Sequence, residues 1–279
     1  MNRFNTRILT VALYLIVSVA ATAKTTIDGI CYDLNSKTLE ATVTYLGERS
    51  FTNYNPPKYT ASSIEIPSEV KYDNKTYKVT TIGSFAFYEC TEVKSIKLPN
   101  TITSIEYKAF QICTSLTSIN LPTSIKDIET SAFASCHSLK SITIPEGVTT
   151  IAQQAFYGCE SLTSIVLPST ITFISPEAFL GCNALKSVTV KSPMPIDMFN
   201  DTFEIYGKLY VPKGSKEAYS KAPIWKNFTI IESEEATGIE GIQRTTPLSS
   251  DKIFSLSGQS LTSPRKGVNI INGKKVVVK

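Results

Sequence analysis

One phrase of 23 residues recurs through the middle of this chain, and this repetition limits the possible folds more than any other feature. Cysteine holds the same place in each copy: Cys90, Cys113, Cys136, Cys159 and Cys182. The phenylalanines of the Ala-Phe pairs keep the same step: Phe87, Phe110, Phe133, Phe156 and Phe179. The prolines do so as well: Pro99, Pro122, Pro145 and Pro168. A fixed period in three residue types indicates an array of structural repeats.

Each copy contains a pattern that is typical of a strand. Polar and apolar residues alternate through Ser95, Ile96, Lys97 and Leu98, which predicts a half-buried strand. Pro99 follows and ends the strand, because proline brings no N–H group to a ladder. A second apolar pair precedes the next Ala-Phe pair. We therefore predict a repeat solenoid, mainly β, in which one coil contains a strand, a proline corner, a short extended return and a turn.

Coils of this kind must stack, since one coil leaves the flanks of its apolar side chains uncovered, and the end coils need caps. The stretch "SSIEIPSEV" predicts an irregular first coil. It is followed by an inserted hairpin, "KYDNKTYKV", with Asp73 and Asn74 at its turn. Residues 27–47 predict two strands that form a β-rich N-terminal cap.

The pattern decays toward the other end of the solenoid. Leu209 and Pro212 keep one more strand-and-proline phrase. Ser215 is placed as the N-cap of a short helix that breaks at Pro223. We expect Trp225 to plug the last coil, so that this helix and the indole form the C-terminal cap.

The last part of the chain is separate from the repeats. Residues 233–251 are polar and unpatterned, which indicates a linker. Beyond it, "VNII" and "KVVV" flank Asn272 and Gly273, a pair that predicts a hairpin in a small β tail.

The first residues have the features of a signal peptide. Arg3 and Arg7 precede an apolar run, and small residues surround Ala23, so the mature chain is expected to begin near Lys24. Removal of the two arginines lowers the formal charge from +4 to +2. The sequence contains no basic stripe that would indicate a nucleic-acid partner. After the first apolar run, no second one of membrane length follows. We expect a secreted or cell-surface protein.

The segments are therefore expected as follows: signal peptide 1–23; N-terminal β cap and irregular first coil 24–78; repeat solenoid 79–190; terminal repeat and C-terminal cap 191–232; linker 233–251; β tail 252–279.

The order Cys-x-x-Leu-x-x-Ile-x-Leu-Pro, preceded by Ala-Phe-x-x-Cys, resembles the BspA-like, or Treponema-type, leucine-rich repeat family from Val79 to Val190. The resemblance implies a leucine-rich repeat solenoid with 23-residue coils. Members of this family are associated with attachment to host matrix proteins and to other bacteria. The final segment resembles the C-terminal sorting tails of exported Bacteroidota proteins, with Asn269 where that pattern has Tyr.

The cysteines allow two interpretations, disulfide bridges or a buried ladder of thiols. Five of them hold the same position in successive coils, so their side chains should point inward in parallel, which gives a poor disulfide dihedral angle. Zinc is disfavoured because ligands on stacked coils form a line rather than a tetrahedron. We therefore favour the thiol ladder, and Cys31 lies outside it.

Catalytic interpretations have little support. His137 is the sole histidine, and it occupies a variable position after Cys136 where a solvated side chain is expected. Asp127, Glu129 and Glu146 are close in sequence, but no motif selects them as a pair for glycoside hydrolysis. We predict no enzymatic activity, no cofactor and no metal.

The residues that alternate with the buried positions of each strand form the candidate binding face. They are small, hydroxyl-bearing or basic, and this ordered polar surface suits an extended partner. The candidate binding face comprises Lys94, Ser95, Lys97, Thr117, Ser118, Asn120, Lys140, Ser141, Thr143, Thr163, Ser164, Lys186, Ser187 and Thr189.

From these features we predict a monomeric, exported repeat protein that acts in adhesion or ligand binding, with an extracellular protein or glycan as its partner. Two alternatives stay open. The solenoid could serve as a structural spacer in the cell envelope, or the protein could take part in polysaccharide use, which requires a concave pocket with paired carboxylates.

Overall fold

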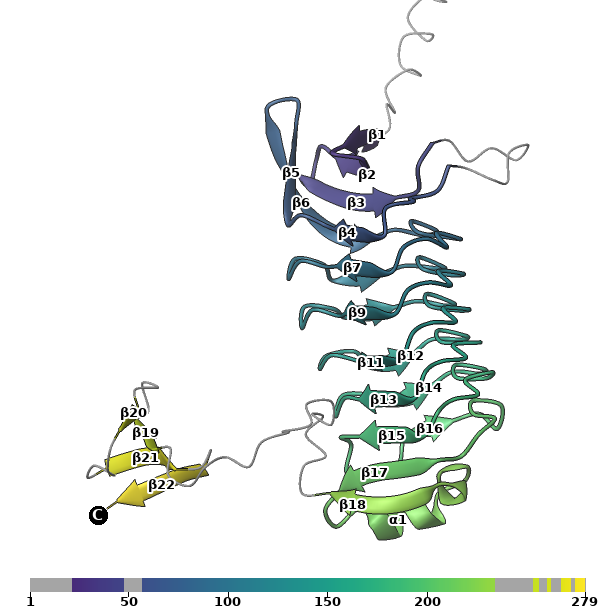
Figure 1. The fold of residues 1–279 in the computed structure, drawn as a ribbon, viewed down its shortest axis with the longest axis vertical. Helices are drawn as coiled ribbons and strands as arrows, with labels where there is room; N and C mark the ends of the chain where they lie inside the picture. The colour runs from purple at the N-terminus through teal and green to yellow at the C-terminus, as the bar shows by residue number, and fades with distance from the viewer. Residues whose placement is uncertain are drawn as a thin grey trace, which may run out of the picture. The chain divides into compact units, whose positions relative to one another are not determined.

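The computed structural model confirms a β-solenoid built from 23-residue coils (Figure 1). It describes residues 22–47 and 57–233, and the strands of a separate C-terminal unit. The chain divides into two compact units, residues 1–238 and 239–279.

One side of the solenoid carries the front strands, which stack in parallel and in register. Ser95 lies opposite Ser118, and Ser164 opposite Ser187, so equivalent positions of the repeat form straight columns. The front strands are β4 (Ser63–Glu65), β7 (Ser95–Lys97), β9 (Ser118–Asn120), β11 (Ser141–Thr143), β13 (Ser164–Leu167), β15 (Ser187–Val190), β17 (Lys208–Pro212) and β18 (Thr229–Ser233).

The opposite side carries shorter return strands, each of which follows a proline corner. Ile105 and Ile128 pair across two of them and point into the core. The return strands are β8 (Ser104–Ile105), β10 (Asp127–Ile128), β12 (Thr150–Ile151), β14 (Phe173–Ile174) and β16 (Asp197–Met198).

A column of phenylalanine rings runs through the turn edge of the core. Phe110 and Phe133 stack with ring centroids 5.0 Å apart, and Phe133 and Phe156 with centroids 5.4 Å apart. The rings are nearly parallel, at 12° and 2°, and fully buried. The column ends at Phe203, which packs on Trp225. Burial of one such ring in each coil makes every coil dependent on its neighbours.

The thiol ladder is confirmed among the described cysteines, all of which are free and buried. Four of these thiols each donate a hydrogen bond to the phenylalanine carbonyl of the preceding coil. The pairs are Cys113 with Phe87 at 3.0 Å, Cys136 with Phe110, Cys159 with Phe133 and Cys182 with Phe156, these three at 3.2 Å. Each of these carbonyls also accepts a backbone N–H group within its own coil, so the thiol supplies a second hydrogen bond, one that joins neighbouring coils.

The N-terminal cap has three strands rather than the two predicted. They are β1 (Thr22–Ile27), β2 (Ile30–Asn35) and β3 (Glu40–Thr44), and β3 pairs in parallel with β6 (Lys75–Ile82). Asp28 and Gly29, both with positive φ, form the tight turn that joins β1 to β2. The predicted inserted hairpin is present, formed by β5 (Glu69–Tyr72) and β6.

The C-terminal cap contains the expected short helix, α1 (Lys216–Lys221), and the 3₁₀ turn η1 (Trp225–Asn227). Ser215 holds the N-cap position, but its side chain makes no capping bond. Glu232 of β18 takes that role, because its Oε1 accepts the N–H groups of Gly214 and Lys216 at 3.0 Å each. Trp225 is buried as expected, and its indole N–H donates to the Ile196 carbonyl at 2.7 Å.

Both sheets of the solenoid are interrupted at one level, which we call the seam. In the described part of the chain, no strand pairing joins β9 to β11 or β10 to β12. The two coils remain joined at the turn edge, where the Phe133 N–H donates to the Ala155 carbonyl at 2.8 Å.

The seam coincides with a missing hydroxyl at a proline corner. In two other coils the corner hydroxyl donates to a carbonyl of the preceding coil, Ser124 to Ile102 at 2.6 Å and Thr170 to Val148 at 2.7 Å. The equivalent residue at the seam is Gly147, which has no side chain to donate. This corner therefore loses one bond that holds successive coils together.

The C-terminal unit is a four-stranded antiparallel sheet in the order β20-β19-β21-β22. The strands are β19 (Ile253–Ser255), β20 (Ser260–Leu261), β21 (Gly267–Ile271) and β22 (Lys274–Val278). Ile271 pairs with Lys274, which leaves two residues for the hairpin turn at the predicted place. Most of the predicted linker lies outside the described residues.

The thiol ladder makes the stability of the fold depend on pH. Burial raises the pKa of Cys90 to about 11 and that of Cys182 to about 12, and it raises the pKa of Cys136 well above the ordinary value. Thiols of the unfolded chain ionise near pH ~8.5. The folded state keeps its thiols protonated, so its stability is complete below that pH and declines as pH rises toward the folded pKa values.

We expect the free energy of unfolding, measured with urea at several values between pH 8 and 10.5, to fall steadily. In Cys136→Ala the slope should be shallower by about 1.4 kcal/mol per pH unit, because one ionising group has been removed. An unchanged slope in this variant would show that the Cys136 thiol ionises as readily in the folded chain as in the unfolded one.

The seam predicts uneven hydrogen exchange. The Glu129 and Ser175 N–H groups each donate to the preceding coil at 2.9 Å. Among the described backbone hydrogen bonds, the equivalent N–H of Ala152 has none. Its amide should exchange about tenfold faster or more, since local opening there breaks fewer bonds. Equal protection at all three positions, measured by NMR, would contradict the seam.

Candidate functional site

The structure places all fourteen residues of the candidate binding face on or beside the front strands, and none of them is buried. Inward and outward positions alternate as predicted: Ile119, for example, is buried, whereas Ser118 and Asn120 on either side of it are exposed. On each side of the seam, the residues of the face belong to parallel strands in register.

Two further residues extend the serine column beyond the positions found from the sequence. Ser63 of β4 pairs with Ser95, and their hydroxyls lie 3.0 Å apart. Lys208 of β17 pairs with Ser187. Both lie where the repeat length departs from 23 residues, so periodicity alone did not place them in the column.

Some hydroxyls of the candidate binding face are already used within the solenoid. Thr117 donates to the Lys94 carbonyl at 3.1 Å, and Thr163 to the Lys140 carbonyl at 3.0 Å. These threonines therefore help to join coils. The hydroxyls of Ser118, Ser141 and Ser164 have no hydrogen-bond partner within the described residues. The central serines are thus among the hydroxyls available to a ligand.

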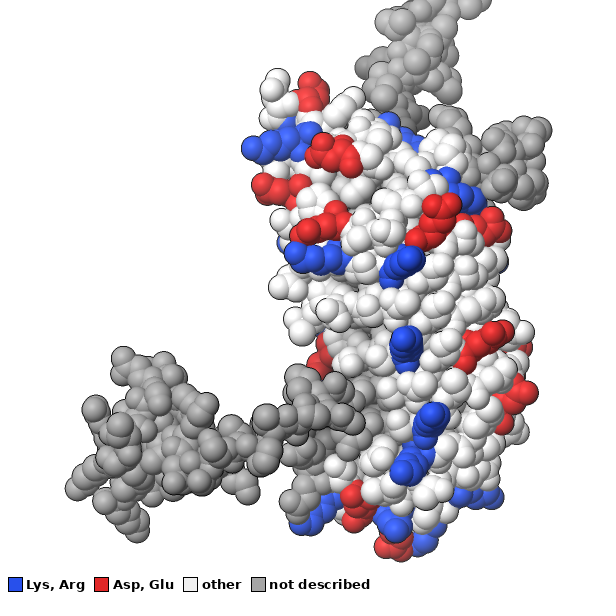
Figure 2. Space-filling model, in the orientation of Figure 1, with Lys and Arg blue, Asp and Glu red and all other residues white. Residues whose placement is uncertain are grey.

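The charges on this side of the solenoid are mostly positive. Figure 2 shows basic side chains one below another down the front strands, with acidic side chains gathered toward the edges. Lys97 is paired with Glu65 at 2.5 Å, but both side chains are largely exposed, so this pair adds little to stability.

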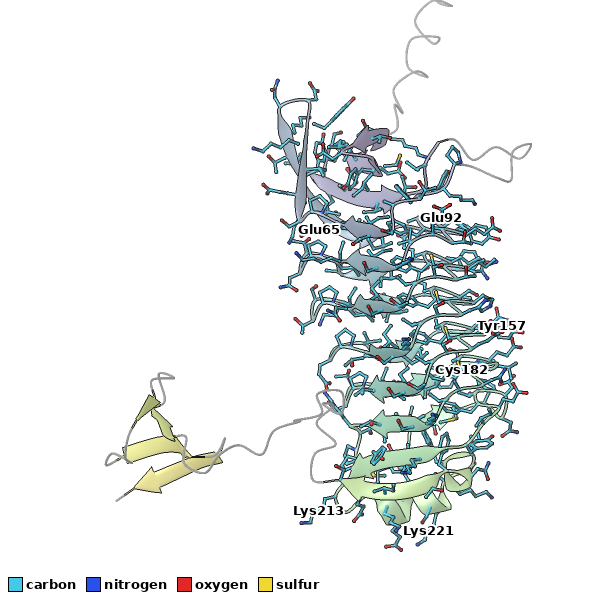
Figure 3. All side chains as sticks on the ribbon, in the orientation of Figure 1. Glu65, Glu92, Tyr157, Cys182, Lys213 and Lys221 are labelled. Atoms are coloured by element: carbon cyan, nitrogen blue, oxygen red, sulfur yellow. The ribbon has the colours of Figure 1, made fainter. Side chains whose placement is uncertain are left out.

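The cysteines and the histidine lie apart from the candidate binding face. Figure 3 shows Cys182 within the stack of coils. His137 is exposed, as expected, and its backbone carbonyl accepts a hydrogen bond from the Ser161 N–H. No group of three His, Cys, Asp or Glu side chains suited to a metal ion occurs in the described part of the chain.

Two of the carboxylates considered for catalysis join neighbouring coils. Glu129 accepts the Tyr107 N–H at 2.9 Å. Glu146 accepts the Ser169 hydroxyl at 2.9 Å and lies 3.3 Å from the Lys191 ammonium. Slight burial acts in the opposite direction, but these hydrogen bonds hold the pKa of Glu146 below its ordinary value.

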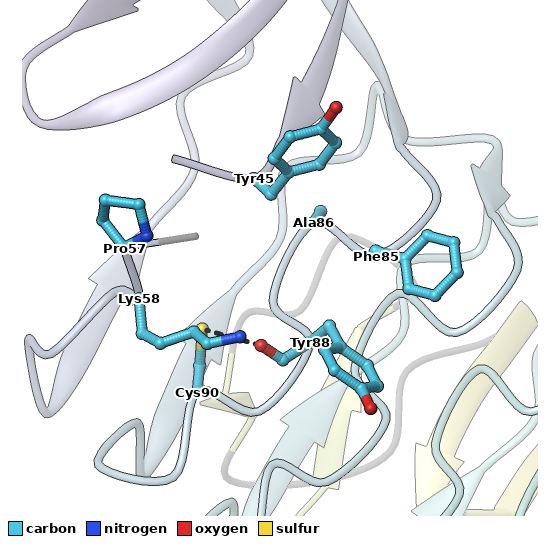
Figure 4. Close-up of a pocket in the computed structure, with 7 residues that line it drawn as sticks. All are labelled: Tyr45, Pro57, Lys58, Phe85, Ala86, Tyr88 and Cys90. Carbon is cyan, nitrogen blue, oxygen red and sulfur yellow. Dashed lines mark hydrogen bonds between the residues drawn. The ribbon is translucent and has the colours of Figure 1, made fainter. Parts of the chain in front are cut away.

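Two hollows lie near the N-terminal cap. An open groove of about 350 Å³ lies between the turn at Asp28 and β4, and Glu65 of β4 is one of its lining residues. A second pocket, of about 10 Å³, lies beside Lys58, Tyr88 and Cys90 (Figure 4). The second is large enough only for a single water molecule. The candidate binding face lies outside both, so a ligand would lie along an open surface.

Residues 80–203 match the protein family described as "BspA type Leucine rich repeat region", in six copies. A comparison with curated proteins gives no match. In the described residues, no helix has the length and apolar character needed to cross a membrane.

Three solved structures show related chains. A leucine-rich repeat protein from Bacteroides ovatus is 30% identical over 67% of this chain and 55% of its own, with a TM-score of 0.45. One from Bacteroides capillosus is 30% identical over 45% of this chain and 84% of its own, with a TM-score of 0.38. The leucine-rich repeat protein of T. pallidum is 25% identical over 73% and 93%, with a TM-score of 0.50. This chain thus spans 55% of the length of the B. ovatus protein.

Proposed function

This chain belongs to the BspA-type leucine-rich repeat family, and from that premise we propose that it is an exported, non-enzymatic protein that binds an extended extracellular partner through the candidate binding face. Adhesion to a matrix protein, another cell surface or a glycan is the activity that such binding would serve.

The observation that carries this proposal is the exposed, in-register column of serines at the centre of the candidate binding face. Ser141 and Ser164 pair in register, and Ser118 holds the equivalent position of the repeat across the seam. Within the described residues the hydroxyls of all three have no hydrogen-bond partner. A rigid surface loses little conformational entropy when a ligand binds, so weak contacts repeated over several coils can add to useful affinity. A linear partner would meet the same groups on each coil.

One observation favours a structural spacer as the second candidate function. Thr117 and Thr163 bond to the preceding coil, and the Ser95 hydroxyl lies 3.0 Å from that of Ser63. Hydroxyls used in this way stabilise the solenoid whether or not a ligand is present. The experiment on the serine column separates the two functions.

Export is part of the proposal and has its own test. Residues 1–21 lie outside the described residues, while Thr22 and Ala23 begin β1. Cleavage after Ala23 would leave Lys24 to Ile27 to pair with β2. We expect the mass of the exported protein to correspond to a start at Lys24, and Ala23→Arg to block processing. An exported chain that retains residues 1–23 would contradict the predicted signal peptide.

Binding should depend on the serine column. A variant with Ser118→Gln, Ser141→Gln and Ser164→Gln places longer neutral side chains on the candidate binding face. We expect it to lose saturable binding to a panel of matrix proteins, mucins and glycans by about tenfold or more, because close contact along the strands is blocked.

The matched control changes exposed hydroxyl residues off the face, Thr123→Gln, Thr149→Gln and Thr150→Gln. It should bind as the unaltered chain does, with both variants equally stable to urea. Equal binding by the serine variant would remove the candidate binding face from consideration. Absence of binding to the whole panel by the unaltered chain would favour the spacer.

A further inference from the structure

Three lysines of the candidate binding face, Lys94, Lys140 and Lys186, form what we call the lysine column. They occupy the same position in alternate coils, and Thr117 and Thr163 fill that position in the coils between them. Neighbouring strands of a sheet lie 4.7–4.9 Å apart, so Lys140 and Lys186 are separated by about 10 Å along the solenoid, and the seam lies between Lys94 and Lys140. The column is therefore a row of point charges with a period of two coils.

The ammonium groups of the lysine column are free. Within residues 57–233 none of them has an ion-pair or hydrogen-bond partner. Other lysines do have one: Lys191 lies 3.3 Å from Glu146, and Lys221 lies 2.6 Å from Glu217.

No acid lies on the central strands around Lys140 and Lys186, whereas the segment that holds Lys94 also contains Glu92. The segments 115–122, 138–145, 161–168 and 184–191, which contain β9, β11, β13 and β15, have no Asp or Glu. A further lysine, Lys208 of β17, pairs with Ser187 and therefore lies one position along the strand from the column. The centre of the candidate binding face thus offers isolated positive charges among hydroxyls.

The chemistry of this surface selects among possible polymers. Nucleic acid has one charge per ~1.7 Å of duplex, a far higher density than the column could match. Protein partners are usually held by large apolar and aromatic anchors. None of the large apolar side chains that the described residues expose lies in the four central segments. A polymer that is rich in hydroxyls and sparsely charged fits better.

We propose that the candidate binding face takes a linear acidic polysaccharide in which one sugar of each disaccharide carries an anionic group. The inference rests on the proposed function, since it names the ligand of the same face. Anionic groups on alternate sugars of an extended chain recur at intervals comparable to two coils. Each anionic group would meet a lysine of the column. The sugar hydroxyls along the chain would meet Ser118, Ser141 and Ser164.

Hyaluronan oligosaccharides, which carry one carboxylate per disaccharide, are the probe, and chitin oligosaccharides of equal length are the neutral comparison. Calorimetry with the full chain should give saturable binding to hyaluronan that weakens as salt is raised, because exposed charges are screened. The variant Lys94→Gln, Lys140→Gln and Lys186→Gln should bind about tenfold more weakly or worse. Its salt dependence should also be shallower.

The matched control removes the same charge from the inserted hairpin, with Lys71→Gln, Lys75→Gln and Lys78→Gln, all exposed and off the front strands. It should bind hyaluronan as the unaltered chain does. Equal losses in both variants would overturn the inference by showing a response to net charge alone. Equal affinity for chitin oligosaccharides, or tighter binding of poly-glutamate, would overturn it as well.

Different results of these binding experiments would reject the proposed function and the acidic polysaccharide. If the serine variant loses a ligand of the panel that the lysine variant keeps, the candidate binding face stands and the acidic polysaccharide is rejected. If neither variant changes any binding, both proposals are rejected.

Discussion

Each coil of this protein is held in place by a phenylalanine ring stacked between the rings of the coils on either side. Phe133 lies 5.0 Å from Phe110 and 5.4 Å from Phe156, in a column that extends from Phe87 to Phe203. A ring at the end of the column would be exposed on one face, which is why the ends are covered, by Tyr59 at one and by Trp225 and Phe228 at the other. The core is therefore complete only when the coils are stacked and both ends are covered.

The same stacking produces the surface. Because the rings and thiols fix successive coils in register, a residue type that recurs every 23 residues becomes a straight column on the front strands. The serine and lysine columns are thus direct consequences of the repeat in the core. The seam shows the reverse relation: where Gly147 lacks the corner hydroxyl, the strands separate although Phe133 and Phe156 remain stacked.

The sequence predicts the regular part of the fold well, because periodicity reports inward and outward positions directly. Ser118 and Ile119 could be assigned to opposite sides without a structure. The features that were missed depend on contacts without a period. β1 lies partly in the predicted signal peptide, Lys208 lies where the repeat length changes, and Glu232 caps a helix from a strand 16 residues away. The ligand of the candidate binding face is a property of the partner, and the sequence alone offers only the spacing and charge of the surface.

The dependence of each coil on stacking can be tested most directly by deletion. Removal of residues 117–139 takes out one complete period and joins Leu116 to Lys140, which restores the order of the repeat. The account predicts a chain that still unfolds cooperatively in urea, with a lower midpoint because one coil of core is lost. Removal of residues 117–128, half a period, should abolish cooperative unfolding, since it displaces every later ring and thiol from its column. Equal tolerance of both deletions, or loss of folding in both, would contradict a fold held by coils in register.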